Sequence, residues 1–249
     1  MLFYLGTHET SWLADFGAPL FVSDRRLRLR KRLPRAAARW ALDSGGFTEL
    51  SQFGAWTTAE ADYIARTRRY ADEIGQLDFA APQDWMCEPS IRDLTGLTVR
   101  DHQERTIRSV LSLRAAAPDL PWIPVLQGWE LSDYLRHIDD YARSGIDLRT
   151  EPVVGVGTVC RRQSTAEGAQ IVRAIARQGI RVHAFGFKLT GLARVRDVVA
   201  SADSMAWSYA ARKCAPLAGC SHASCANCRK FAGAWRERVV SEPRQWSLL

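Results

Sequence analysis

The sequence predicts an α/β fold, a (β/α)8 barrel of the TIM type followed by a small cysteine-rich segment. Short apolar runs recur along the 249 residues, and amphipathic stretches with helical spacing separate them. Strands that alternate with helices in this way are typical of parallel α/β proteins. The alternation stops after residue 212, where four of the six cysteines gather. These patterns predict a barrel over residues 1–213 and a separate segment over residues 214–249.

Eight apolar runs are the candidate strands, which is the number that closes a (β/α)8 barrel. A doubly wound open sheet is the alternative, because hydrophobic periodicity does not distinguish a closed barrel from an open sheet. In chain order the runs are Leu2–Leu5, Leu20–Val22, Trp40–Leu42, Leu77–Ala81, Trp122–Leu126, Val153–Val156, Arg181–Phe185 and Ser204–Trp207.

Two of the intervening stretches, residues 105–114 and 169–179, predict helices most clearly. The second ends at Gly179, and glycine is favoured directly after a helix because it adopts a left-handed backbone without strain. In the first, residues recur at the three- and four-residue spacing of one helix face. These residues are Ile107, Val110, Leu111 and Arg114.

The composition restricts the location and the partner. No apolar run is long enough to span a bilayer, and the amino-terminal "MLFYLGTHETSW" lacks the features of a signal peptide. We therefore expect a cytoplasmic protein without a membrane partner, whose cysteines are reduced or bound to metal. The net charge of +7 favours a polyanionic partner. Residues 24–39 hold eight basic residues and one acid, which predicts either a substrate-binding loop or plain solvated surface.

Polar residues and glycines stand at the carboxyl ends of the predicted strands, the edge at which α/β active sites assemble. Asp203 differs, because it precedes the predicted last strand. Helix caps and turns are the alternative for each residue taken alone. The neighbouring Trp85 and Trp129 are candidates for stacking on a base, with burial in the core as their alternative. The strand-end residues are Asp43, Asp84, Gln127, Gly155, Gly157, Gly186 and Lys188.

The stretch "LDSGGF" places Asp43 directly before Ser44, Gly45 and Gly46. Glycines permit backbone conformations and close approaches that larger residues exclude. A carboxylate beside such bare backbone favours a site for a small planar ligand. The alternative is a strand followed by an Asx-type turn and a helix cap, with no chemistry.

The stretch "CSHASCANC" supplies Cys220, His222, Cys225 and Cys228. A Cys-x2-Cys pair with two further ligands nearby is typical of tetrahedral zinc sites. Four protein ligands leave no open position, so the sequence predicts a structural Zn2+ ion. Cys214 competes for the fourth place, in which case it would displace His222 or Cys220. A set of free thiols is the other alternative.

Several motifs in order resemble those of the tRNA-guanine transglycosylase superfamily, and most closely its deazapurine DNA modification branch (DpdA). They are "LDSGGFTELS", "APQDWMCEP", "VLQGW", "GVGTVCRRQ", "FGFK", "ADSMAWSYAAR" and the carboxyl-terminal cysteine cluster. The resemblance covers nearly the whole chain. It implies a barrel enzyme that replaces guanine in DNA by a 7-deazapurine such as preQ0, through a covalent aspartyl-glycosyl intermediate. It leaves open whether helper proteins open the DNA.

The resemblance also implies roles for individual residues. Asp43 is similar to the first catalytic aspartate, which handles the proton of the leaving or entering base. Asp84 is similar to the base-recognition aspartate. The nucleophile precedes a Pro-Thr-Arg segment in the tRNA enzymes, and counting back from Arg212 reaches Ala206, which cannot act; we assign the role to Asp203. The rest of the base pocket is Ser44, Gly45, Gln127, Gly128, Gly155 and Gly157.

Three other functions remain as alternatives, one of which is an unrelated barrel enzyme with a phosphate site. The same chemistry could act on tRNA, although the chain leaves little room for an added RNA-binding domain. The protein could also be a zinc-containing nucleic-acid binder without catalysis. Release of labelled guanine distinguishes either enzyme from such a binder.

Overall fold

The computed structural model describes residues 1–160 and 162–241, and its eight strands form one parallel sheet in the order β4-β3-β2-β1-β8-β7-β6-β5. This order follows the chain around a circle, as in a (β/α)8 barrel. The strands are β1 Leu2–Thr7, β2 Leu20–Ser23, β3 Trp40–Asp43, β4 Leu77–Ala80, β5 Val125–Leu126, β6 Val154–Val156, β7 Val182–Ala184 and β8 Ser201–Ser204.

A parallel bridge joins the two ends of this order. Ala80 in β4 pairs with Trp122, which lies just before β5. The Ala80 amide donates to the Pro121 carbonyl at 3.0 Å, and the Ile123 amide donates to the Ala80 carbonyl at 3.2 Å. The sheet therefore curls into a barrel, and the predicted fold class is confirmed.

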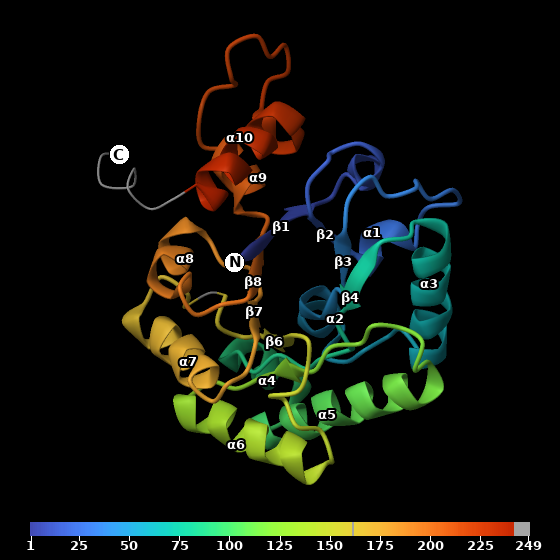
Figure 1. Cartoon of the computed structure of the whole chain (residues 1–249), viewed down its shortest axis with the longest axis vertical. Coiled ribbons are helices and arrows are strands. Elements are labelled where there is room, and N and C mark those ends of the chain that lie inside the picture. Colours follow the sequence, from blue (N-terminus) through green and yellow to red (C-terminus); the bar gives the residue numbers. More distant parts are fainter. Residues whose placement is uncertain (161, 242–249) are drawn as a thin grey trace.

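Helices surround the curled sheet (Figure 1). The predicted helices over residues 105–114 and 169–179 correspond to α5 and α7, but α7 ends at Ala176 with Arg177 as its C-cap, before the predicted end at Gly179. Leu111 of α5 faces solvent with 40% of its surface exposed. The helices are α1 Asp24–Leu27, α2 Gly46–Phe53, α3 Glu60–Glu73, α4 Pro89–Thr95, α5 Val99–Ala116, α6 Leu131–Arg143, α7 Ala166–Ala176, α8 Leu189–Val195, α9 Ala206–Ala211 and α10 Arg229–Val240, with short 3-10 turns η1 Thr10–Ala14 and η2 Cys225–Asn227.

Side chains fill the amino-terminal half of the barrel. Successive residues of a strand point to opposite faces, so every second one enters the interior. Tyr4, Ala41, Phe79 and Ile123 form a buried cluster there, and the Tyr4 hydroxyl donates to Asp78 at 2.7 Å. Since this end is filled, open space remains at the carboxyl ends of the strands.

The last strand differs from the prediction. It spans Ser201–Ser204, and the apolar residues that suggested a strand over 204–207 begin helix α9 instead. The strand has few apolar residues because its polar side chains have partners inside the barrel: Ser201 contacts His183, and Asp203 accepts from the Gly186 amide. Asp203 thus lies near the carboxyl end of β8, beside Tyr4 of β1.

The described part of the cysteine-rich segment packs on the barrel. Helix α10 contacts β1, where the Trp235 and Phe3 rings lie 5.9 Å apart. Phe231 and Cys225 also belong to the main hydrophobic core. Residues 242–249 of the predicted segment lie outside the described residues. Among the described residues, no helix combines the length and the apolar character needed to cross a bilayer.

Candidate functional site

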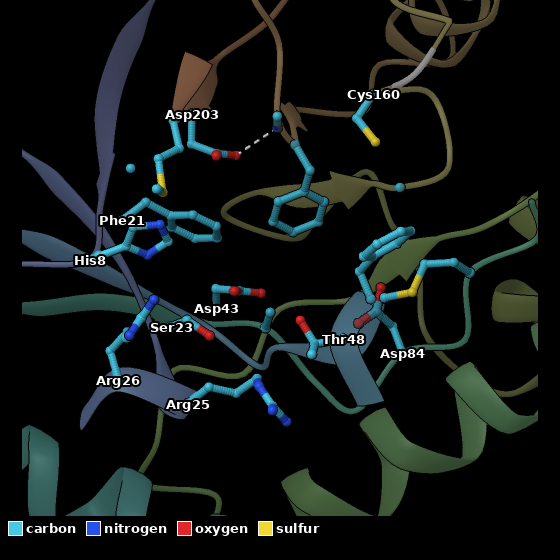
Figure 2. A pocket seen from close by; sticks show the side chains of 18 of the residues that line it. His8, Phe21, Ser23, Arg25, Arg26, Asp43, Thr48, Asp84, Cys160 and Asp203 are labelled. Carbon is cyan, nitrogen blue, oxygen red and sulfur yellow. Dashed lines mark hydrogen bonds between the residues drawn. The ribbon is translucent and has the colours of Figure 1, made fainter. Parts of the chain in front are cut away.

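A cavity of about 640 Å³ opens at the carboxyl ends of the strands, and its lining includes four carboxylate residues, Asp43, Asp84, Glu88 and Asp203. Figure 2 shows Asp43 of β3, Asp203 of β8 and Asp84 of the loop after β4 around it, with Arg25 and Arg26 along one side. Its size is that of ordinary small-ligand pockets. Of the predicted site residues, those that line it are Asp43, Asp84, Gln127, Gly157 and Asp203.

The pleat of the sheet directs the catalytic candidates inward. Asp43 follows the interior residue Ala41 by two positions, so it points to the same face. Asp203 follows Ser201 by two positions, and Ser23 lies opposite Asp43 in the pairing of β2 with β3. Three strands thereby aim polar side chains at one space.

Asp43 lies in an environment that opposes its ionisation. Removal from water raises the pKa of this carboxyl, and the negative charges of Asp203 and Asp24 raise it further. The Gly45 amide donates to Oδ1 at 3.0 Å and, with the Ser23 hydroxyl, acts in the opposite direction. The raised pKa suits a group that exchanges a proton with a base.

The two glycines after Ser44 make room for neighbouring side chains. Gly45 has a φ of +79°, and a Cβ there would lie 2.8 Å from Cγ of Arg25. A Cβ on Gly46 would lie 2.7 Å from Cε of Met86. Gly45 is not among the lining residues of the cavity. Its amide donates to the Asp43 side chain two residues earlier, which is the bond of an Asx-type turn.

The other predicted glycines have similar packing roles. A Cβ on Gly157 would lie 2.3 Å from Nε2 of Gln127, so this glycine admits the amide into the cavity wall. A Cβ on Gly155 would lie 2.3 Å from the Phe185 ring, and one on Gly128 would lie 2.9 Å from Cβ of Asp133. Neither Gly155 nor Gly128 lines the cavity.

Asp84 begins a chain of hydrogen bonds in the cavity wall. The Gln127 amide nitrogen donates to Asp84 Oδ2 at 2.6 Å, and the Thr158 hydroxyl donates to Gln127 Oε1 at 2.5 Å. Ser44 is not a lining residue but donates to Asp84 Oδ1 at 3.4 Å. Burial, assisted by the charge of Asp43, raises the pKa of Asp84 to about 7.

Thr158 is a site residue that the sequence patterns missed. Its φ is +62°, which is rare for a β-branched residue, and its hydroxyl accepts from the Cys87 amide at 2.9 Å. Such strained residues concentrate at functional sites, where the surroundings hold them in place. Here Thr158 connects the loop after β6 with the loop after β4.

Asp203 is oriented by donors from the neighbouring strand β7 and from the loop that follows it. Its Oδ1 accepts from the Gly186 amide at 2.9 Å and from His183 Nε2 at 3.3 Å. Nδ1 of His183 pairs with the Ser201 hydroxyl at 2.8 Å. Because a carboxylate only accepts, His183 carries its proton on Nε2 in this arrangement. Both bonds end on Oδ1, so Oδ2 is the oxygen suited to attack.

The mouth of the cavity is basic and partly aromatic. Burial lowers the pKa of His8, and the positive charges of Arg26 and Arg212 lower it further. Arg26 lines the mouth together with Arg25, so the beginning of the basic stretch reaches the cavity. Its end does not, because Arg39 pairs with Asp78 at 2.8 Å near the amino ends of β3 and β4. Three phenylalanine rings, Phe21, Phe47 and Phe185, also line the cavity.

The two tryptophans proposed for stacking lie elsewhere. Trp85 is buried, with the Arg105 guanidinium 4.6 Å from its ring centre. Trp129 has Arg162 at 3.9 Å over its ring. Neither tryptophan is among the lining residues of the cavity.

Cys220, His222, Cys225 and Cys228 form one group whose ligand atoms all lie within 4.8 Å of one another. Zinc–sulfur bonds of about 2.3 Å in a tetrahedron place two sulfurs about 3.8 Å apart. The Cys220 and Cys228 sulfurs are 3.8 Å apart, and His222 Nε2 lies 3.1 Å from the Cys225 sulfur. Cys214 lies outside the group, against the Ala210 carbonyl. The group could hold a metal ion such as zinc.

The whole chain matches a known family. A family model described as DpdA, DeoxyPurine in DNA protein A, matches residues 1–248. No curated protein matches the chain significantly. Since the match spans nearly every residue and the barrel is the fold that the motifs implied, the chain belongs to the DpdA family, which is tRNA-guanine transglycosylase-like and modifies DNA.

Proposed function

We propose that the protein is a pentosyltransferase that replaces guanine in DNA by a 7-deazapurine such as preQ0. The observation that carries this proposal is the meeting of Asp43, Asp84 and Asp203 in one cavity at the carboxyl ends of the strands. Retaining exchange at C1′ requires one carboxylate as nucleophile and a second as acid and base. Recognition of the base edge uses the third.

Asp203 is the proposed nucleophile. Its Oδ2 attacks C1′ of the deoxyribose, an ester bond forms, and the bond from C1′ to guanine N9 breaks. Asp43 donates the proton that neutralises the departing guanine, which agrees with its raised pKa. The incoming 7-deazapurine then loses its N9 proton to Asp43 and attacks C1′ from the opposite side. Two inversions retain the configuration and return Asp203 to its carboxylate form.

Asp84 is the proposed reader of the base. An ionised carboxylate accepts from the N1–H and the amino group of guanine, and preQ0 presents the same donors. The bond from Gln127 fixes the orientation of the carboxylate. Phe47 and Phe185 supply apolar faces against which a flat purine can lie.

The cysteine and histidine group is the proposed holder of a structural zinc ion. Four protein ligands complete a tetrahedron, so the ion would take no part in the exchange. Its ligands lie on the chain between α9 and α10, and the metal would fix α10 against β1.

Exchange assays with matched polymers test the proposal. The purified protein receives preQ0 with DNA or tRNA that carries labelled guanine, and mass spectrometry of the nucleosides follows. We expect guanine release and a deazapurine nucleoside from DNA. Exchange only into tRNA would favour the tRNA enzyme, and binding without release from either polymer would favour the non-catalytic binder.

The same assay compares duplex DNA with single-stranded and bubble DNA. If duplex DNA does not react but single-stranded or bubble DNA does, a partner that opens the helix is required for duplex substrates. The reaction chemistry proposed for Asp43 and Asp203 is the same in both cases.

A further inference from the structure

Leu29 combines two properties that are rare together. It lines the mouth of the cavity, and 75% of its surface is exposed, the largest fraction among the large apolar side chains of the described residues. An exposed leucine loses the benefit of burial. It follows α1 by two residues, at the carboxyl end of the barrel where the base would enter.

Basic residues surround this leucine in the chain. Arg26 lines the cavity and is exposed, and Arg30 is exposed as well. Arg28 lies 3.3 Å from the Thr58 hydroxyl and 3.6 Å from Glu49. An apolar tip between arginines suits a polymer with stacked bases inside and phosphates outside.

Several buried contacts attach the segment before Leu29 to the barrel. Asp24 at the start of α1 is buried and accepts two bonds from Arg66, each 2.8 Å long. The Tyr70 hydroxyl donates to the same carboxylate at 2.9 Å. Arg25 pairs with Glu49 at 2.6 Å, and Leu27 is fully buried. These contacts attach the short turn that precedes Leu29 to the barrel.

The proposed carboxylates lie too deep in the barrel for a base that stays stacked in a duplex to reach them. Asp84 is only 6% exposed, and it lies inside the barrel. A guanine within a duplex has both its C1′ and its Watson–Crick edge hidden, so it must leave the stack to reach this residue. The departing base leaves a gap between its neighbours, which an apolar side chain can fill.

We infer that Leu29 is a wedge that enters duplex DNA and fills the space left by the guanine as it turns into the cavity. Arg26 and Arg30 hold the phosphates on either side. This inference rests on the proposed function in taking DNA as the substrate, and it adds the residue that opens the helix.

Comparison of two DNA forms tests the wedge. Leu29→Ala is assayed on guanine in a matched duplex and on the same guanine in a single strand. We expect exchange on the duplex to fall at least about tenfold more than exchange on the single strand, because only the duplex must be opened. Leu29→Met should restore most of the loss. Leu111→Ala, which removes an exposed leucine on the outer surface of α5, should change neither rate. An equal loss on both forms would overturn the wedge.

A second readout does not depend on catalysis. In the Asp203→Asn background, 2-aminopurine beside the target guanine reports loss of stacking by a rise in fluorescence. We expect a rise that Leu29→Ala abolishes and Leu111→Ala preserves. If the rise depends on Leu29 but no DNA undergoes exchange, the wedge stands and the proposed reaction fails. If exchange occurs while no rise is seen, or the rise is independent of Leu29, the wedge fails and the reaction stands.

Discussion

At the scale of single residues, Asp84 must satisfy two opposing requirements. In its proposed role it would read the base without competition from water because it is buried, yet burial raises its pKa to about 7. Below this value the carboxyl is protonated and presents a hydroxyl to base donors. At higher pH it is an acceptor on both oxygens. The residue therefore links recognition of the base to pH in the neutral range.

Base binding should follow this titration. We expect the affinity for preQ0 to rise about tenfold between pH 6 and pH 8, since the ionised fraction of Asp84 rises by about that factor around a pKa of about 7. Calorimetric titration of the free base measures it. Asp84→Asn should bind weakly with a flat profile, and a wild-type affinity that ignores pH would contradict the assigned role.

The same carboxyl should lower stability at high pH. Its pKa is raised in the folded state, so its contribution to stability is present below about pH 4 and is lost as the pH rises through about 7. The shift from 3.8 to about 7 corresponds to at most about 4 kcal/mol of unfolding free energy. In urea unfolding, Asp84→Asn should therefore gain stability over the wild type at pH 8 but not at pH 4. The exposed Asp93→Asn is the matched control.

Substitution of the two proposed catalytic aspartates should have different effects. Asp203→Asn should abolish exchange at least about a thousandfold, because a neutral amide cannot form the glycosyl ester. Asp43→Asn should also lose turnover, because it can neither protonate the departing guanine nor take the proton of the incoming base. It keeps the nucleophile, however, so denaturing electrophoresis should still detect a slowly formed covalent adduct with DNA that Asp203→Asn cannot form. Near-normal exchange in Asp203→Asn would transfer the nucleophilic role to another carboxylate.

At the scale of elements, several contacts attach helix α10 to the barrel. Trp235 packs on Phe3, and Arg196 donates to the carbonyls of Val239 and Val240 at 3.0 and 2.6 Å. The cysteine and histidine group precedes the helix. A bound metal would stabilise the loop between α9 and α10 that carries this group. The cavity lies on other elements of the barrel.

Metal removal should loosen this element first. We expect about one zinc ion per chain and, after chelation, faster hydrogen exchange over residues 229–240 before any change around Asp43. Cys225→Ser should lose the metal, whereas Cys214→Ser should keep it, because Cys214 lies outside the group. A native protein without metal, with Cys225 and Cys228 freely alkylated, would disprove the site.

At the scale of the whole molecule, we expect only part of the net charge of +7 to contribute to DNA binding. Arginines at the cavity mouth are placed to contact phosphates, whereas those at the opposite end of the barrel are not. The affinity for duplex DNA should fall linearly with salt on logarithmic axes, with a slope of about −0.9 per phosphate contacted. Distribution of charge, and not its sum, should decide that slope.

Two triple variants compare exposed arginines of the basic stretch, residues 24–39, with exposed arginines near the amino ends of the strands. Replacing Arg26, Arg30 and Arg32 by Gln should flatten the slope by up to about 2.7 without changing which base is exchanged. The same replacement at Arg143, Arg149 and Arg177, which are exposed near the amino ends of the strands, should leave the slope nearly unchanged. Fluorescence anisotropy over a range of salt concentrations measures both. Equal effects would indicate that binding follows net charge alone.

The sequence by itself determined what depends on local patterns. Apolar runs and helical spacing predicted seven of the strands and helices α5 and α7, because burial of one face imposes its period on the chain. The cysteine spacing predicted the cysteine and histidine group, because ligands so close in the chain can meet in one local turn, and the structure brings all four ligand atoms within 4.8 Å of one another. Asp43 and Gln127 were found because they end apolar strands, and parallel strands all end at one edge.

Only the tertiary structure decided what depends on register and closure. The polar strand β8 is held by partners from β7, so no apolar pattern marked it, and Asp203 was placed at the wrong end. The left-handed backbone of Thr158 and the exposure of Leu29 are invisible in residue type. The glycines show the same limit. A glycine in the sequence indicates that another group approaches the backbone closely, but only the fold shows whether that group is a ligand, the Phe185 ring or the Gln127 amide. These features arise from contacts between segments distant in the chain, which local preferences do not encode.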